Sequence, residues 1–131
     1  MQDYRKLKVW EKAHELVLDI YLATKRFPNE EMYGVTSQLR RAVISVSANI
    51  VEGSGRKTAP DFARFLSMSL GSTNEVEYFL LLSKDLGYLK NGEYQSLCNQ
   101  LIEIRKMLVS FAAKVRKTWK LNNWKLIDWQ L

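Results

Sequence analysis

The sequence has very few of the residues that cross-link or interrupt a chain: one Cys, two Pro and six Gly among 131 residues. The single cysteine, Cys98, excludes an intramolecular disulfide and fits a reducing compartment. In a helical pattern such a residue is expected to be a small buried side chain. The scarcity of Gly and Pro disfavours a sheet of many strands, because each strand would need a turn after it.

Long apolar runs are also missing. The longest unbroken run is residues 79–82, far too short for a membrane span. The first ten residues lack the apolar centre of a signal peptide. With 47% hydrophobic and 26% charged residues, the composition is that of an ordinary globular chain, and its length suits one domain. We therefore expect a single cytoplasmic domain without membrane contact.

Acidic residues are absent between Ile104 and Ile127, although the chain as a whole has a net charge of +6. A charge bias of this kind bears on partners and solubility rather than on fold. It is compatible with a solvated face or with a phosphate-binding surface. Judged from charge alone, the solvated face is the favoured interpretation. The basic residues of this stretch are Arg105, Lys106, Lys114, Arg116, Lys117, Lys120 and Lys125, and a second group is Arg40, Arg41, Arg56 and Lys57.

Apolar residues recur at steps of three and four in four segments, about residues 8–25, 36–52, 60–85 and 91–119. This spacing lines up side chains on one face of a helix, and the last segment keeps the 3.5-residue repeat of a bundle seam. Helices of this length with short links predict an all-α fold, an antiparallel up-down four-helix bundle. The predicted core stripes are Val9, Ala13, Leu16, Ile20, Ala23 and Phe27; Val35, Leu39, Ala42, Val46 and Ile50; Phe62, Leu66, Ser69, Thr73, Val76 and Leu80; and Tyr94, Leu97, Leu101, Ile104, Leu108, Phe111 and Val115.

Small and polar residues mark the expected helix ends. Thr36 or Ser37 is expected to cap the second helix, and residues 53–55 to form a flexible stop after it. Gly71 lies inside the third helix, at a cost of about 1 kcal/mol against Ala, which predicts a close helix crossing there. Gly87 is expected to form the C-terminal cap of the same helix.

Residues 1–118 are predicted to form the bundle domain and residues 119–131 a Trp-rich C-terminal tail. Trp119, Trp124 and Trp129 recur every five residues, a spacing that does not close a helical face. Three exposed Trp side chains would be unfavourable unless they dock on something. The tail is therefore expected either to fold back on its own bundle or to cover a neighbouring subunit.

A catalytic or metal-binding constellation is not apparent. Glu11 and His14 have the Glu-x-x-His spacing used by di-metal sites in helical bundles, but a complete site needs a second such pair and His14 is the only histidine. The chain has no Cys-x-x-Cys pair for zinc, and nothing marks a partner for His14 as a catalytic base. We therefore expect no metal, cofactor or small-molecule substrate, and a binding or assembly protein rather than an enzyme.

Several motifs resemble the four helix bundle proteins encoded in 23S ribosomal RNA intervening sequences. The resemblance covers about residues 4 to 115, in the right order. The chain departs from it at Ser47 or its neighbour, where family members often carry Pro, and at Thr73, where they often carry Leu. The matching motifs are Leu7-Lys8-Val9-Trp10 with Ala13-His14 and Leu16; Phe27-Pro28; Tyr33-Gly34 with Thr36-Ser37-Gln38 and Arg40-Arg41-Ala42; Ser45, Asn49-Ile50 and Glu52-Gly53-Ser54-Gly55; Phe62 with Phe65-Leu66; Gly71-Ser72 with Glu75 and Glu77; and Leu86-Gly87-Tyr88.

This resemblance implies a four-helix subunit that forms a homo-oligomer, a ring of five, and a link to structured RNA; it implies no biochemical activity. We therefore predict a non-enzymatic, oligomeric bundle that contacts RNA phosphates and recognises shape or charge. A protein adaptor without direct nucleic-acid contact, whose basic surface meets an acidic protein, is the alternative. The candidate phosphate-binding residues are Arg40, Arg41, Arg56, Lys57, Arg64, Lys114, Arg116 and Lys117.

Overall fold

The computed structural model describes residues 3–121. Helix α1 spans Lys8–Thr24, α2 spans Val35–Ser54, α3 spans Ala59–Asp85 and α4 spans Asn91–Lys120. Two short 3-10 helices, η1 at Tyr4–Lys6 and η2 at Asn29–Glu31, precede α1 and α2. No strand occurs between residues 3 and 121, and the predicted all-α class is confirmed.

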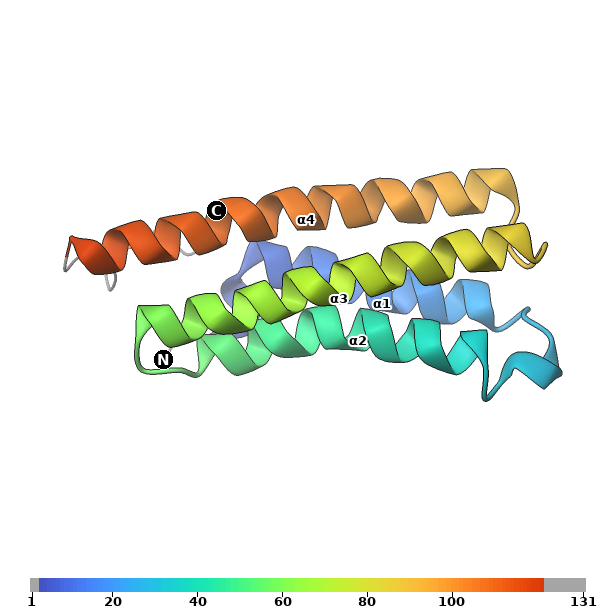
Figure 1. Ribbon diagram of the computed structural model, residues 1–131, viewed down its shortest axis with the longest axis horizontal. Helices are drawn as coiled ribbons and strands as arrows, with labels where there is room; N and C mark the ends of the chain where they lie inside the picture. The colour runs from blue at the N-terminus through green and yellow to red at the C-terminus, as the bar shows by residue number, and fades with distance from the viewer. Residues whose placement is uncertain (1–2, 122–131) are drawn as a thin grey trace.

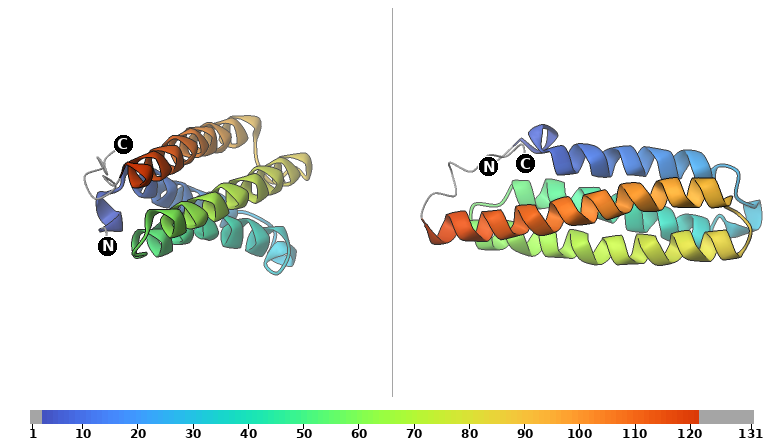
Figure 2. Two further views of the ribbon diagram at one scale, coloured as in Figure 1. Left: turned by 60° about the vertical axis from the view of Figure 1, so that its left-hand side comes forward. Right: turned by 90° about the horizontal axis from the view of Figure 1, so that it is seen from above.

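The four helices lie roughly along the long axis of the molecule, with neighbours in the chain running in opposite directions (Figure 1). Each helix packs against its chain neighbours, and α1 also packs against α4, so the bundle closes. This is the up-down topology that the short links predict. The C-terminal end of α4 extends past the connection between α2 and α3 (Figure 2, right).

The predicted core stripes meet in the centre of the bundle. All stripe residues of α2 and α3 are buried, and so are those of α4 from Leu97 to Val115. Ala23 and Tyr94 are only partly buried, at the edge of the core. Phe62 and Phe111 meet edge to face with ring centroids 5.5 Å apart, a favourable aromatic geometry that joins α3 to α4.

The start of α2 differs from the expectation. The helix begins at Val35, one residue earlier than expected, and Thr36 is buried inside its first turn. The carboxylate of Glu31 instead accepts a hydrogen bond from the Val35 backbone N–H at 3.4 Å. The prediction of Thr36 or Ser37 as the cap is therefore wrong, because the preceding η2 helix supplies the acceptor.

Two glycine assignments also need correction. Residues 53–55 are not a flexible stop: Gly53 is buried within α2, which continues to Ser54. The close helix approach is at Gly53, where an added Cβ would lie 2.8 Å from Phe62 Cδ1 and from Phe65 Cβ. Gly71 is exposed, and a Cβ there would meet no atom of residues 3–121 within 4 Å. The crossing predicted at Gly71 is therefore wrong, because α3 directs its bulky rings, not this glycine, at α2.

Gly87 does end α3 as predicted. It has a φ of +83°, which a residue without a side chain adopts at little cost. Its N–H donates to the Lys84 carbonyl, and the Tyr88 N–H donates to the Ser83 carbonyl, both at 2.9 Å. This pair of hydrogen bonds is the Schellman motif, which satisfies the last carbonyls of the helix.

Candidate nucleic-acid interface

One end of the bundle gathers basic side chains from the α2–α3 connection and from helices α3 and α4. The antiparallel topology brings the start of α3 next to the last turns of α4, at the same end of the bundle as the α2–α3 connection (Figure 1). The Arg116 guanidinium on α4 donates a hydrogen bond to the Ser67 hydroxyl on α3 at 3.2 Å, which fixes the two helices at this level. We call this surface the basic end; its members are Arg56, Lys57, Arg64, Arg116, Lys117 and Lys120.

Arg56 and Arg64 are held against the same aromatic ring. Their guanidinium carbons lie 4.5 Å and 4.6 Å from the centroid of Phe65, within the range of a cation–π contact. Asp61 lies between them, 2.9 Å from Arg64 and 3.7 Å from Arg56, and Glu52 pairs with Arg56 at 3.2 Å. These contacts orient both side chains, yet 39% of Arg56 and 59% of Arg64 stay exposed. Both arginines can therefore still meet a ligand.

The other cations of the basic end are less neutralised. Within residues 3–121, no carboxylate lies at ion-pair distance from Lys57, Arg116, Lys117 or Lys120. The basic end therefore has six cationic side chains but only two carboxylates paired with them, those of Asp61 and Glu52. The surplus of positive charge makes this end attractive to a polyanion.

A groove runs along the basic end between the start of α3 and the last turn of α4. It has a volume of about 340 Å³ and is lined by Pro60, Ala63, Arg64, Arg116, Trp119 and Lys120. Apolar surface forms its floor, because Ala63 is buried and the Trp119 indole is partly buried against the core. Neither Lys120 nor Trp119 is among the candidate residues predicted from the sequence. The spacing of Arg116, Trp119 and Lys120, three and four positions apart, is the signal that could have indicated them.

The sequence-predicted candidates do not form one surface. Arg40 and Arg41 lie near the start of α2 and Arg56 and Lys57 beyond its end, about 24 Å apart at 1.5 Å per residue. The Arg40 guanidinium lies 4.5 Å from the Tyr21 ring centroid and donates to the Thr24 hydroxyl at 2.8 Å. Arg40 therefore joins α1 to α2, and the grouping of Arg40 and Arg41 with Arg56 and Lys57 is wrong.

Lys114 lies apart from the groove as well. It is half-buried and borders a separate hollow of about 260 Å³ with Lys106, Met107, Ser110 and Phe111. Positions 114 and 116 are two apart on α4 and so point to different sides of the helix. Of the eight candidates, Arg56, Lys57 and Arg64 come together around Asp61, and Arg116 lines the same groove as Arg64. Lys117 follows Arg116 in the same turn of α4, whereas Arg40, Arg41 and Lys114 lie apart.

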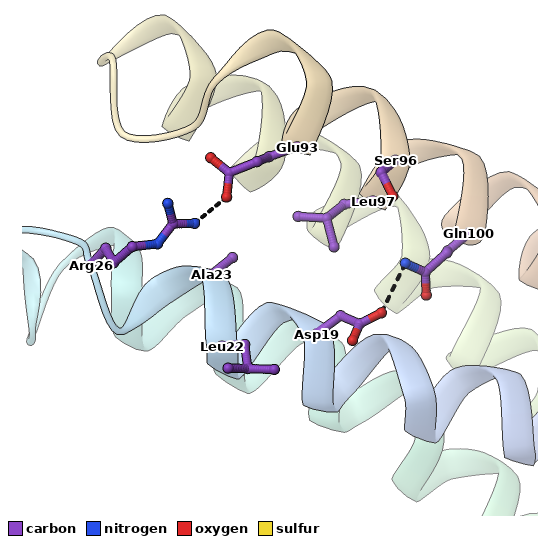
Figure 3. A pocket seen from close by; sticks show the side chains of 8 residues that line it. All are labelled: Asp19, Leu22, Ala23, Arg26, Glu93, Ser96, Leu97 and Gln100. Carbon is purple, nitrogen blue, oxygen red and sulfur yellow. Dashed lines mark hydrogen bonds and ion pairs between the residues drawn. The ribbon is translucent and has the colours of Figure 1, made fainter.

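A second crevice, of about 320 Å³, lies between α1 and α4 (Figure 3). The Arg26 and Glu93 side chains form an ion pair across one end of it, and Gln100 Nε2 donates to Asp19 Oδ2 at 3.0 Å at the other. The hydrogen bond from Arg26 lowers the pKa of the Glu93 carboxyl below its ordinary value. Each polar group that spans the crevice therefore has a partner, and we interpret these contacts as bridges between two helices.

The possible metal ligands and reactive side chains that the sequence offered were located in the described part of the chain. No three His, Cys, Asp or Glu side chains there are grouped so that they could hold a metal ion. His14 is exposed and stacks on Trp10, with ring centroids 5.0 Å apart and planes at 8°. Burial raises the pKa of the Cys98 thiol, which disfavours the reactive thiolate. In the same part of the chain, no helix combines the length and apolarity needed to span a membrane.

The fold and this surface define the protein class: a small up-down helical bundle whose most distinctive surface is a cationic end. The chain belongs to the 23S rRNA-intervening sequence protein family, whose sequence model matches residues 5–110. The resemblance stated from the sequence motifs is thereby confirmed.

A solved structure supports the same assignment. A protein of unknown function from the S23 ribosomal protein family of Bacteroides thetaiotaomicron superposes with a TM-score of 0.73 at 30% sequence identity. The match covers 79% of this chain and 97% of that one. No curated protein matches the chain. Neither the family description nor that of the solved relative names a catalytic activity.

Proposed function

We propose that this protein is a non-enzymatic, RNA-associated bundle that contacts phosphates of structured RNA through its basic end. The observation that carries this proposal is the gathering of six cations, from the α2–α3 connection, α3 and α4, at one end of the bundle with only two carboxylates. Arginines held on a ring and by a carboxylate lose little further freedom when they bind a phosphate. Family membership supports a link to ribosomal RNA but names no activity.

The contacts proposed here are to the RNA backbone. The cations of the basic end come from the α2–α3 connection, the start of α3 and the last turns of α4, so they do not form a single row along one helix. Phosphate contacts position a protein without carrying sequence information. We therefore expect recognition of RNA shape and charge, with little sequence preference.

Salt dependence of binding tests this proposal. Fluorescence anisotropy with a labelled RNA hairpin should give an affinity that falls steeply between 50 and 200 mM salt, because counterion release weakens phosphate contacts. The double variant Lys57→Gln/Lys117→Gln should reduce the slope of log affinity against log salt by about 2, one per lost contact. The charge-matched control Lys25→Gln/Lys106→Gln changes exposed lysines away from the basic end and should leave the slope unchanged.

The results separate RNA binding from the adaptor alternative. Binding that is insensitive to salt, or a slope that falls equally in both double variants, would refute phosphate contact at the basic end. If the hairpin does not bind but poly-glutamate does, the basic end meets an acidic protein instead, and the RNA proposal fails.

We further propose that the protein assembles with copies of itself, with the five-membered ring that the family resemblance implies as the expected form. Exposed apolar side chains support this. Met68 and Tyr78 are exposed on α3, by 46% and 57%, and Ile44 is 40% exposed on α2. The hydrogen bond of 2.8 Å between Ser45 and Ser72 keeps the two helices adjacent here. An apolar patch of this kind is typical of an interface.

A further inference from the structure

The groove at the basic end combines features of a nucleotide site. We propose that it binds one unpaired nucleotide of an RNA, with the base on the apolar floor of Pro60, Ala63 and Trp119 and the phosphate beside Arg64, Arg116 and Lys120. This inference rests on the proposed association with RNA, and it adds a preference for an unpaired base that phosphate contacts alone would not give.

The floor supplies the surface that a base requires. Ala63 is 2% exposed and Trp119 is partly buried against the core, so packing holds both residues in place, and Trp119 and Pro60 provide most of the accessible apolar surface. Pro60 is exposed on the first turn of α3 and forms the outer border. Aromatic and apolar surfaces bind bases of any type, because every base presents a π-face. The site therefore favours an unpaired nucleotide without selecting its identity.

The cations are placed on the rim of this floor. Arg116 is oriented by the Ser67 hydroxyl at 3.2 Å, and Arg64 by Asp61 at 2.9 Å and by the Phe65 ring at 4.6 Å. Three cations line the groove, and the one carboxylate beside Arg64 is shared with Arg56. A guanidinium matches two phosphate oxygens with two parallel N–H groups. The groove thus has a charge surplus that fits the phosphate next to a bound base.

Size also favours a single nucleotide. The volume of about 340 Å³ lies at the lower end of the range for small-ligand sites, roughly 300–1,000 Å³. A partner helix would need a longer groove, since its anchor residues extend over two or more turns. An acidic peptide would match the rim cations but has no flat group for the floor. Residues 122–131, which include Trp124 and Trp129 and follow directly after α4, are a competing occupant that the experiment must distinguish.

The test compares two RNA hairpins that differ by one bulged nucleotide, with the full-length protein. We expect the bulged hairpin to bind about fivefold or more tightly than the fully paired one, the lower end of the effect of stacking one base. Pro60→Glu places a carboxylate at the border of the groove and should abolish this preference. Position 60 is exposed in the first turn of α3, where an acidic residue suits the helix dipole, so the variant should fold. The control Lys57→Gln should weaken binding of both hairpins equally.

Each other outcome overturns the inference in a recognisable way. Equal affinity of the wild-type protein for both hairpins would refute the nucleotide site and leave phosphate contact at the basic end intact. Absence of binding to either hairpin would refute the proposed function as well. A preference that survives in Pro60→Glu would mean that the unpaired base binds elsewhere. If the preference for the bulged hairpin appears only when residues 122–131 are deleted, those residues fill the groove in the full chain.

Discussion

At the scale of single residues, Gly53 and Gly71 occupy opposite environments on two paired helices. Gly53 is buried in α2 beneath the rings of Phe62 and Phe65, whereas Gly71 is exposed on α3. A hydrogen atom instead of a side chain lets α3 approach α2 at the first position. At Gly71 the absence of a side chain only lowers the stability of the helix.

These environments predict opposite effects of the same substitution. Gly53→Ala should lower the free energy of unfolding by about 1–3 kcal/mol, because the new methyl group would have to displace two aromatic residues in a packed core. Gly71→Ala should raise it by up to about 1 kcal/mol through better helix propensity. Urea denaturation of both variants measures the two effects. A Gly53→Ala protein as stable as Gly71→Ala would show that the α2–α3 approach is looser than described.

At the scale of elements, α4 is the helix with the most regular pattern. Its seam residues from Leu97 to Val115 are buried, and the exposed residues between them include Ile102 and Val109. The apolar stripe of α4 packs into the bundle along its length, while its last turns bring Arg116 and Lys120 to the basic end. The residues that stabilise the bundle and those proposed to contact the ligand thus lie on different parts of the same helix.

The register of α4 can be tested with neighbouring residues. Leu108→Asp places a charge at a position that is 0% exposed and should prevent folding, or cost several kcal/mol of a total stability of about 5–15 kcal/mol. Leu101→Asp, at a position that is 1% exposed, should behave alike. Val109→Asp introduces the same group at a position that is 55% exposed and should change stability by less than about 0.5 kcal/mol. Thermal melting by circular dichroism distinguishes them, and a normal melt of Leu108→Asp would contradict this register.

At the scale of the whole molecule, the apolar residues outside the core stripes divide into two groups. Val43 and Phe65 are buried within the single chain and need no partner. Ile44, Met68 and Leu81 are 40%, 46% and 40% exposed. Exposed residues such as these, together with Tyr78 at 57% exposure, therefore support an interface between copies, whereas the buried ones do not. Trp124 and Trp129, which the sequence offered as further interface residues, lie outside the described residues.

Light scattering tests self-assembly. The full-length protein should have several times the chain mass of 15.3 kDa, about five times for the proposed ring. Met68→Glu should lower the mass of the assembly by introducing a charge into the apolar patch on α2 and α3. Leu22→Glu is the control, because Leu22 is 62% exposed on α1, at the crevice between α1 and α4 and away from the α2–α3 pair. A wild-type monomer at micromolar concentration would contradict assembly; equal loss in both variants would contradict this choice of surface.

The fold could be predicted from the sequence almost completely. The four helices, their core faces and the Gly87 cap all follow from residue types at fixed spacing, and the structure confirms them. Helical periodicity is a local property, because a side chain's direction depends only on its position along its own helix. The exceptions are local as well: Glu31 replaces the expected Thr36 cap because a short η2 helix intervenes.

The candidate site could be predicted only in part. The sequence supplied five of the clustered cations but grouped Arg56 with Arg40, which lies near the other end of α2 and contacts Tyr21. It also gave no sign that the start of α3 and the last turn of α4 enclose a groove with Trp119. The sequence states which residues are charged, but the surface that they form depends on which helix ends pack next to each other. Residue identity and periodicity therefore determined the bundle, and only tertiary packing of distant segments decided which basic residues share one end.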